Sequence, residues 1–211
     1  MKIAVVDYGM GNLRSVSKAL EHVAPQAAVQ VTDSPGEVQA ADRVVFPGQG
    51  AMPECMREMD ARGLRPALLA AAQSKPFLGI CIGLQMLFDY SEEGGVRGLG
   101  ILPGRVRRFP DEAMFDRGGI RLKVPHMGWN QVHQDRAHPL WSGIEDPSRF
   151  YFVHSYFVEA EQPEVVGGTA VYGVPFTCAV AKDNIFAVQF HPEKSQIAGL
   201  RLLANFVNWN P

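Results

Sequence analysis

The sequence has few cysteines, balanced charge and no long hydrophobic run. Its three cysteines, Cys55, Cys81 and Cys178, lie far apart and form no CxxC pair, so we expect neither a disulfide framework nor a zinc or other metal site. The 20 Lys and Arg residues are matched by 22 Asp and Glu residues, which gives no electrostatic reason to expect a nucleic-acid or membrane-surface partner. No stretch approaches the roughly 18 apolar residues of a membrane span. These absences favour a soluble protein of the reducing cytoplasm.

Motifs for binding a nucleotide cofactor are also missing. The segment "DYGMGN" at 7–12 could begin a dinucleotide-binding GxGxxG motif, but Arg14 stands where the third glycine would be needed. A phosphate-binding loop of the GxxxxGK(S/T) type does not occur either. We therefore predict no cofactor and interpret Asn12 as the N-cap of a helix. The N-terminal segment has a short apolar run without a cleavage-site pattern, so we expect no secretory signal.

The first half of the chain has the pattern of a parallel sheet covered by helices. With 211 residues and 46% hydrophobic content, the chain can bury the core of one α/β domain, and we expect a single domain over 1–211. Short apolar runs alternate with helix-compatible segments, and the runs are continuous, as in strands buried on both faces. The expected strands are 2–8, 27–33, 43–48 and 76–81, and the expected helical segments are 12–23, 53–73 and 83–91.

The second half has a different texture, beginning near Gly98. Strand-length runs are separated by Gly, Pro and Asn, which indicates hairpins and an antiparallel extension of the sheet. These runs cover 100–110, 122–133, 149–160, 167–174, 176–184 and 185–193. A segment with a helical pattern, 195–209, follows them.

The segment "GICIGLQ" at 79–85 places Cys81 between a predicted strand and a predicted helix. At a sharp strand-to-helix turn a cysteine projects its sulfur above the sheet, and the flanking Gly79 and Gly83 allow the backbone to turn and pack closely. The N–H groups of the following helix would point at an oxyanion formed beside the sulfur. On its own this segment leaves two interpretations open, a catalytic nucleophile or an inert thiol in a tight core turn.

A cysteine nucleophile needs a base, and one of the six histidines has a suitable neighbour. His191 ends an apolar strand and is followed by Pro192 and Glu193, so the carboxylate can turn back onto the imidazole and orient it. We therefore predict a Cys81, His191 and Glu193 triad. For the other histidines we expect surface positions or satisfied positions in the core; they are His22, His126, His133, His138 and His154.

Glycine-rich backbone follows another predicted strand in "FPGQGAMPE" at 46–54. Ligands bind at the carboxyl edge of a parallel sheet, and free N–H groups at Gly48, Gln49 and Gly50 could complete an oxyanion hole. Taken alone, the segment is better interpreted as a plain turn.

With these motifs in place, the chain resembles the class I glutamine amidotransferases. Within that family it looks most like the glutaminase subunits of imidazole glycerol phosphate synthase, an enzyme of histidine biosynthesis. "GICIGLQ" and "FHPEKS" match the shared nucleophile and base segments, while "DYGMGNLRSV", "PHMGWN" and "FYFVHSYF" carry the closer likeness. The match runs from Lys2 to the last predicted helix. It implies a flavodoxin-like α/β fold with a central, mostly parallel sheet, flanking helices and an antiparallel extension.

The resemblance also implies roles for individual residues. Cys81 matches the nucleophile, His191 the base and acid, and Glu193 the carboxylate that orients the base. The oxyanion hole matches Gly48, Gln49, Gly50 and Ile82. The positions that bind the α-amino and α-carboxylate groups of glutamine match Gln85, Glu93, Ser155 and Tyr156. The positions that face a partner match Tyr8, Gly9, Met10, Asn12, His126, Met127, Gly128, Trp129 and Asn130. Gln49 departs from the family pattern, because many relatives carry valine between these two glycines.

The partner that the resemblance implies is a cyclase subunit with a (β/α)8 barrel, joined to this chain in a heterodimer. Ammonia released from glutamine would pass to the cyclase, which makes imidazole glycerol phosphate and an aminoimidazole carboxamide ribotide. Two other interpretations are open to the residues alone: a glutaminase that serves another synthase, such as that of pyridoxal phosphate, and a redox-sensing cysteine protein of similar architecture. "PHMGWN" and "DYGMGN" argue against the first, and "HPE" argues against the second.

Overall fold

A sheet of mostly buried strands organises the structure. The computed structural model describes residues 1–116 and 118–211, and within them eleven strands form one sheet and two strands form another. The strands are β1 (Lys2–Val6), β2 (Ala28–Thr32), β3 (Arg43–Gly48), β4 (Phe77–Cys81), β5 (Phe88–Ser91), β6 (Val96–Arg97), β7 (Leu102–Arg108), β8 (His126–Val132), β9 (Ser148–His154), β10 (Tyr156–Ala160), β11 (Val166–Tyr172), β12 (Val174–Lys182) and β13 (Ile185–Val188). The α-helices are α1 (Leu13–Val23), α2 (Pro35–Ala40), α3 (Met52–Ala61), α4 (Arg65–Ser74), α5 (Ile82–Gln85) and α6 (Gln196–Asn208).

The parallel part of the large sheet has the order β2-β1-β3-β4-β13. Strands β3, β4 and β13 are buried along their whole length, which explains their continuous apolar sequences. Beyond β13 the sheet continues through β12, β10 and β7 with antiparallel pairs, and β11 pairs with β12. Strands β8 and β9 form the separate antiparallel pair. The predicted fold class, a parallel core with an antiparallel extension, is therefore confirmed.

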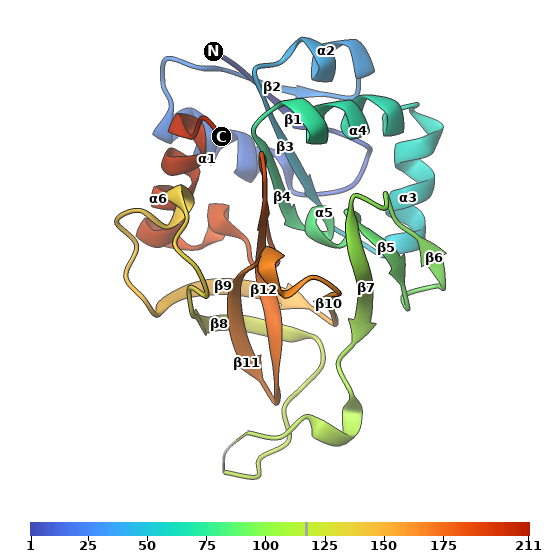
Figure 1. The fold of residues 1–211 in the computed structure, drawn as a ribbon, viewed down its shortest axis with the longest axis vertical. Helices are drawn as coiled ribbons and strands as arrows, with labels where there is room; N and C mark the ends of the chain where they lie inside the picture. Colours follow the sequence, from blue (N-terminus) through green and yellow to red (C-terminus); the bar gives the residue numbers. More distant parts are fainter. Residues whose placement is uncertain (117) are drawn as a thin grey trace.

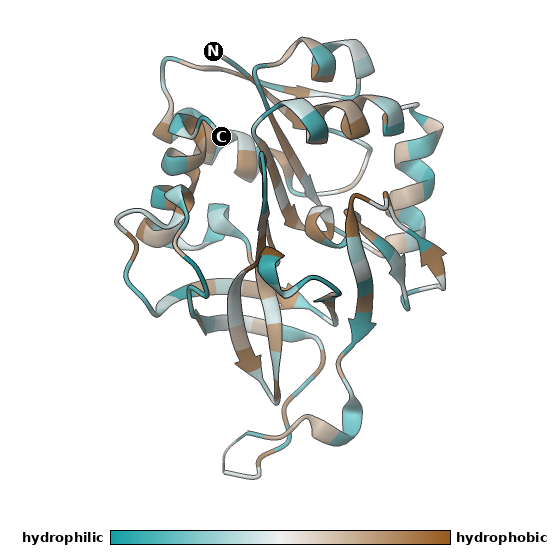
Figure 2. Cartoon of the chain, in the orientation of Figure 1, coloured by the Kyte–Doolittle hydropathy of each residue, from teal (hydrophilic) through white to brown (hydrophobic). Residues whose placement is uncertain are grey.

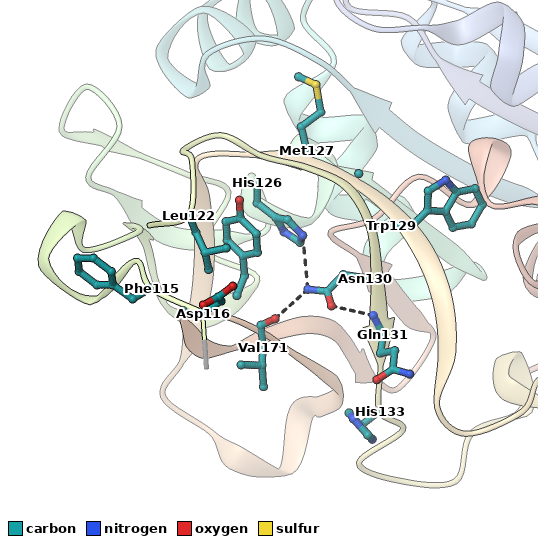
Figure 3. A pocket seen from close by; sticks show the side chains of 13 residues that line it. Phe115, Asp116, Leu122, His126, Met127, Trp129, Asn130, Gln131, His133 and Val171 are labelled. Carbon is teal, nitrogen blue, oxygen red and sulfur yellow. Dashed lines mark hydrogen bonds between the residues drawn. The ribbon is translucent and has the colours of Figure 1, made fainter. Parts of the chain in front are cut away.

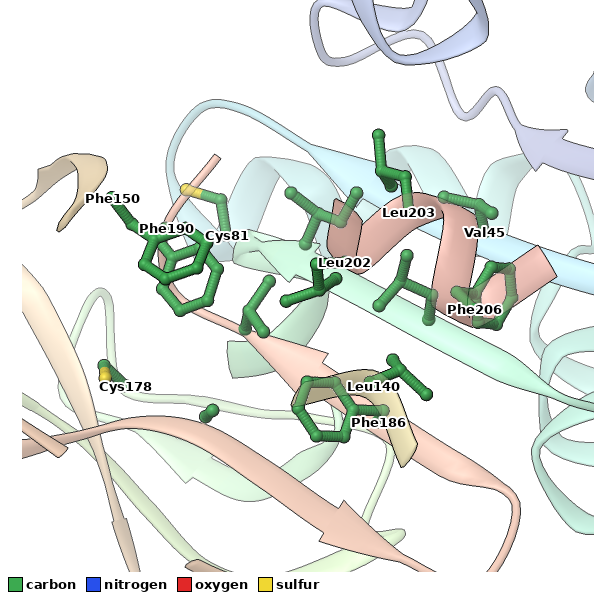
Figure 4. Packing of buried hydrophobic residues seen from close by; sticks show 14 of the residues in the cluster. Val45, Cys81, Leu140, Phe150, Cys178, Phe186, Phe190, Leu202, Leu203 and Phe206 are labelled. Carbon is green, nitrogen blue, oxygen red and sulfur yellow. The ribbon is translucent and has the colours of Figure 1, made fainter. Parts of the chain in front are cut away.

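Helices cover both faces of the parallel strands. In Figure 1, α1 and α6 lie on one side of them, and α2, α3 and α4 lie on the other. The strands between these helices are largely hydrophobic (Figure 2). On the α6 side, Leu202, Leu203 and Phe206 pack onto the sheet, while Phe150 and Phe190 stack with 4.1 Å between their ring centroids (Figure 4). Two apolar layers thus fix the central strands and the turns that follow them.

Three predicted elements differ from the structure. The expected helix over 83–91 is wrong, because α5 ends at Gln85 and the chain continues as strand β5. The main-chain carbonyl of Leu87 accepts hydrogen bonds from the N–H groups of Ile101 (2.9 Å) and Leu102 (3.0 Å). Pairing with this later segment therefore holds the apolar run in an extended conformation instead of a helix.

The other two differences are interruptions of predicted segments. Segment 53–73 forms two helices, α3 and α4, separated at Gly63, whose φ of +65° ends a helix readily. The run 149–160 is divided at Ser155 into β9 and β10, which belong to different sheets. Asn12 occupies the N-cap position of α1 as expected, although its side chain makes no capping hydrogen bond.

The close packing of α5 on β3 predicts an intolerant glycine. A Cβ atom at Gly83 would lie 1.9 Å from the main-chain oxygen of Phe46, so Gly83→Ala must displace backbone and should lower the free energy of unfolding by more than about 2 kcal/mol. Gly36→Ala in α2 is the matched control. Its Cβ meets nothing nearer than 3.8 Å, and alanine should stabilise that helix by up to about 1 kcal/mol. Urea denaturation of both variants measures the difference, and equal effects would contradict the packing argument.

Candidate active site

Cys81 lies at a strained turn between β4 and α5. Its φ of +57° is uncommon for a residue with a side chain, and such a conformation costs about 1–3 kcal/mol unless the surroundings impose it. The surroundings here are tight, because a Cβ at Gly79 or at Gly83 would collide with neighbouring atoms. Cys81 is 8% exposed, so the turn presents the sulfur at a small opening. This is the elbow geometry predicted from "GICIGLQ".

His191 and Glu193 form a buried pair beside this turn. Nδ1 of His191 lies 2.9 Å from Oε1 of Glu193, and their side chains are 5% and 1% exposed. A carboxylate can only accept, so Nδ1 carries the hydrogen, and Nε2 has no hydrogen-bond partner among the described residues. Burial, the largest influence, acts to lower the pKa of His191, but the nearby Cys81 sulfur and the Glu193 carboxylate outweigh it and raise the pKa to about 10. The pair therefore favours a protonated imidazole beside the Cys81 sulfur.

The backbone of His191 is held from two sides. Its N–H donates to the Tyr151 carbonyl at 2.9 Å, and its carbonyl accepts from the Ser195 hydroxyl at 2.6 Å. Helix α6 approaches so closely that a Cβ at Gly199 would lie 1.9 Å from the Pro192 oxygen. Neither Ser195 nor Gly199 was identified from the sequence, although Ser195 lies within the quoted "FHPEKS". These contacts fix the direction of the imidazole.

A cavity of about 230 Å³ brings most of the predicted site residues together. Its walls come from the turns after β3 and β4, from the break between β9 and β10, and from the segment after β13. The lining residues are Gln49, Gly50, Cys81, Ile82, Gln85, Glu93, Pro125, Val153, His154, Ser155, Tyr156 and His191. Gly48 lies directly behind, paired in register with Cys81, and Glu193 lies behind His191. Pro125, Val153 and His154 were not predicted to line the site.

Backbone donors are available where an oxyanion would form. Ile82 begins α5, so its N–H has no partner inside the helix. Among the described residues no backbone hydrogen bond is donated by the N–H of Gln49 or Gly50, whereas the Gln49 carbonyl accepts from Cys55 Sγ at 3.8 Å. The Gln49 side chain is exposed. Gln49, the residue that departs from the family pattern, thus lines the cavity beside Cys81 and is also exposed to solvent.

Two polar side chains line the part of the cavity expected to hold a glutamine backbone. Gln85 donates through Nε2 to the Tyr156 carbonyl at 3.2 Å, and its buried Oε1 has no hydrogen-bond partner in the described residues. Glu93 accepts through Oε2 from the Met52 N–H at 2.8 Å, at the start of α3. Both groups are thus anchored on one side. The Oε1 atom of each side chain is left for a ligand to use.

A pair of buried histidines lies behind this wall of the cavity. Nδ1 of His126 lies 2.9 Å from Nε2 of His154, and Nδ1 of His154 donates to the Tyr156 carbonyl at 2.8 Å. Since that carbonyl can only accept, His154 carries its hydrogen on Nδ1, and Nδ1 of His126 must donate to His154. His126 also stacks on Tyr172 with 3.9 Å between ring centroids. Both imidazoles occupy satisfied core positions, one of the two settings expected for them.

The positions expected to face a partner divide into two groups. The side chains of Tyr8 and His126 are buried, so they can support such a surface only from beneath. Met127 and Trp129 are 62% and 38% exposed, and in Figure 3 they point away from His126 and Asn130. Gly9 and Asn12 are also exposed, and Met10, Gly128 and Asn130 are partly exposed. Strand β8 borders a second cavity of about 430 Å³ (Figure 3).

In the described part of the chain, no helix has the length and apolar character needed to cross a membrane.

Comparison with known proteins gives a consistent family. The model of the class I glutamine amidotransferases matches residues 4–209. The chain is 70% identical over 209 residues to imidazole glycerol phosphate synthase subunit HisH of Thiobacillus denitrificans, covering 99% of this chain and 92% of that protein. It is 68% identical to the HisH subunit of Nitrosospira multiformis, covering 99% and 98%. The structure of PurLQS from Thermotoga maritima shares the fold, with a TM-score of 0.72 at 17% identity over 98% of this chain and 97% of that one.

The buried histidine pair predicts a loss of stability in mild acid. Burial lowers the pKa of His126 to about 4. Burial is also the main cause of the lowered pKa of His154, which is about 3, whereas an unfolded histidine titrates near about 6.5. The unfolded state therefore binds more protons below that pH, and the stabilisation is lost as pH falls from about 6.5 toward 4 and 3. The raised pKa of His191 has the opposite effect on stability, because its stabilisation of the folded state is lost as pH rises from about 6.5 toward about 10.

His126→Asn keeps a donor for His154 but removes one of the titrating groups. Between pH 7.5 and 5.5 its free energy of unfolding should fall by about 1 kcal/mol less than that of the wild type. Urea denaturation at several pH values measures this slope, with the exposed His22→Asn as the control for loss of a histidine. Identical slopes in wild type and His126→Asn would contradict the assignment.

Proposed function

The chain belongs to the class I glutamine amidotransferases, among the HisH subunits of imidazole glycerol phosphate synthase, and we propose that Cys81 hydrolyses glutamine to supply this synthase with ammonia. The observation that carries the proposal is the arrangement at one cavity: Cys81 and His191 both line it, and Glu193 holds the far nitrogen of the imidazole at 2.9 Å. This is the combination of nucleophile, base and orienting carboxylate that acyl transfer requires. The single domain over 1–211 and the triad roles are part of this proposal.

In the first half of the reaction, the Cys81 thiolate attacks the side-chain amide carbon of glutamine. The carbonyl oxygen becomes an oxyanion, which the N–H groups of Ile82 and of the Gly48 to Gly50 segment stabilise, each donor contributing about 3 kcal/mol in comparable sites. The raised pKa of His191 keeps its imidazole protonated, so Nε2 can give its proton to the departing nitrogen. The C–N bond breaks, ammonia leaves and a γ-glutamyl thioester remains on Cys81.

In the second half, water replaces ammonia in the cavity. His191, now neutral, takes a proton from this water through Nε2 as the oxygen attacks the thioester carbonyl. A second oxyanion forms at the same donors and collapses to glutamate, and Cys81 is released as a thiolate beside protonated His191. Glu193 stabilises the imidazolium and keeps Nε2 aimed at the cavity throughout.

The rest of the cavity supplies groups for the two ends of the substrate. We assign the α-amino group to the free oxygens of Gln85 and Glu93, because an ammonium is attracted by acceptors and by negative charge. The α-carboxylate is assigned to the Ser155 and Tyr156 segment, where β9 gives way to β10. This orientation places the side-chain amide toward Cys81.

A HisH chain is one subunit of a larger enzyme, so a partner subunit is implied. We propose that this partner is a (β/α)8 barrel cyclase in a heterodimer, which uses the ammonia to make imidazole glycerol phosphate and an aminoimidazole carboxamide ribotide in histidine biosynthesis. Ammonia released into water would be protonated and would lose its nucleophilicity, which favours a partner docked over the cavity. The proposed compartment is the cytoplasm, because three free thiols are typical of a reducing environment.

The chemistry is tested by Cys81→Ser in the complex with the cyclase. Glutamine-dependent turnover should fall at least about a thousandfold, because serine is a much poorer nucleophile without its own activation. Turnover supported by added ammonium should stay at the wild-type level, which serves as the control for folding and assembly. Retained glutamate release by Cys81→Ser would remove Cys81 from the mechanism.

The partner surface is tested by truncating its exposed apolar side chains. Trp129→Ala should weaken binding of the cyclase about tenfold or more, since aromatic anchors dominate many interfaces. Val31→Ala is the matched control, because Val31 is 41% exposed and lies on β2 at the edge of the large sheet, whereas Trp129 lies in the separate β8-β9 pair. Titration calorimetry measures both affinities. Equal binding by Trp129→Ala and wild type would place the partner elsewhere.

A further inference from the structure

Gln189 is a fully buried amide directly beside the nucleophile. It follows β13, two residues before His191, and its relative exposure is 0%. Its Nε2 lies 3.7 Å from Cys81 Sγ, and its Oε1 accepts from Gln85 Nε2 at 2.9 Å. An uncharged polar side chain in an otherwise apolar run, "FAVQF", is costly to bury unless its groups are paired. Neither the triad nor the oxyanion hole gives this residue a role.

The orientation of the Gln189 amide follows from its neighbours. The main-chain carbonyl of Tyr156 can only accept, so Gln85 must turn its nitrogen toward it. The same nitrogen then faces Gln189, which has to present its oxygen. The remaining NH₂ group of Gln189 is thereby directed at the Cys81 sulfur.

The two polar contacts of the sulfur favour different protonation states. As a thiol, Cys81 can donate to the Val153 carbonyl at 4.0 Å. As a thiolate it has no hydrogen to donate, and the carbonyl dipole is unfavourable. The Gln189 N–H group, at 3.7 Å, is a donor and is therefore stronger toward the charged sulfur than toward the neutral one.

We propose that Gln189 is a positioning residue that holds the Cys81 sulfur and stabilises its thiolate by hydrogen-bond donation. Gln189 is absent from the residues that line the cavity, so it acts on the substrate through Cys81 and Gln85 and not by direct contact. The proposal rests on the proposed function, because it assigns a supporting role within that same site. The side chain of Gln85, which is assigned to binding the substrate, also orients Gln189 through its hydrogen bond to Gln189 Oε1.

Other titratable groups also face Cys81. His191 and Glu93 line the same cavity, and Glu193 lies behind His191. On the β3 side are Tyr8 and Cys55, whose pKa values are raised chiefly by burial. All of these groups stay unchanged when Gln189 is replaced, so a difference between variants reports on the Gln189 contact.

Two substitutions separate the contact with sulfur from the contact with Gln85. Gln189→Met keeps a side chain of similar length and removes both polar contacts. Gln189→Glu keeps the shape and an acceptor for Gln85 but loses the donor to sulfur, and it tests the inference if Gln189→Met does not fold. Gln73→Met, at an exposed position of α4, is the control for replacing a glutamine.

The experiment measures alkylation of Cys81 by iodoacetamide against pH in the complete complex, with the Cys81 peptide followed by mass spectrometry. The pH of half-maximal rate should rise by about one unit in Gln189→Met and at least as much in Gln189→Glu, with about a tenfold slower rate at pH 7. For glutamine hydrolysis, kcat should fall about tenfold while KM changes less than threefold. A purely structural role would leave the pH midpoint in place.

Midpoints in both Gln189 variants equal to that of Gln73→Met would overturn the inference, whatever happens to kcat. Wild-type complex that hydrolyses no glutamine would instead contradict the proposed function. Alkylation reports on the sulfur without any turnover, so the two failures are distinguishable.

Discussion

The parallel pairing of β4 with β3 on one side and β13 on the other is the constraint on which the site depends. Gly48 is paired with Cys81, and Val188 with Ile80, so all three strands end at the same edge. Parallel strands that end together deliver their following turns to one place. The backbone after Gly48, the turn at Cys81 and the segment of His191 therefore meet, although His191 lies 110 positions after Cys81 in the sequence. The burial of these strands under α1 and α6 on one face, and under α2 to α4 on the other, makes that meeting point rigid.

This rigidity allows the site to keep polar atoms without protein partners. Among the described residues, buried side-chain atoms that lack a hydrogen bond include Gln85 Oε1, His191 Nε2 and Glu193 Oε2. Each costs about 1–3 kcal/mol in a folded protein unless a ligand or water satisfies it. Gln85 and His191 line one cavity and Glu193 lies behind His191, so these atoms, together with the positive φ of Cys81, show where the fold gives up stability. A substrate that bonds to Gln85 Oε1 or His191 Nε2 recovers part of that cost on binding.

Sequence reasoning succeeded where a local pattern determines the structure. Continuous apolar runs predicted the buried parallel strands, and a glycine-flanked cysteine predicted the turn at Cys81. It failed where contacts from distant parts of the chain decide. The expected helix over 83–91 becomes β5 because its backbone pairs with β7. Gln189 has no local signal beyond its polarity, since its partners Gln85 and Cys81 lie 104 and 108 positions away. The roles of the site residues remain predictions.

The polar groups around the cavity form one connected network rather than separate contacts. Starting on β8, hydrogen bonds run through Asn130, His126, His154, the Tyr156 carbonyl, Gln85, Gln189 and Cys81. Every member has its donor and acceptor direction set by the Tyr156 carbonyl, which accepts from both branches. A displacement of β8 therefore either lengthens these bonds or moves the carbonyl that orients the amide beside Cys81. Strand β8 also carries the exposed Met127 and Trp129, so the surface proposed to face a partner and the surroundings of the Cys81 sulfur are connected through this strand.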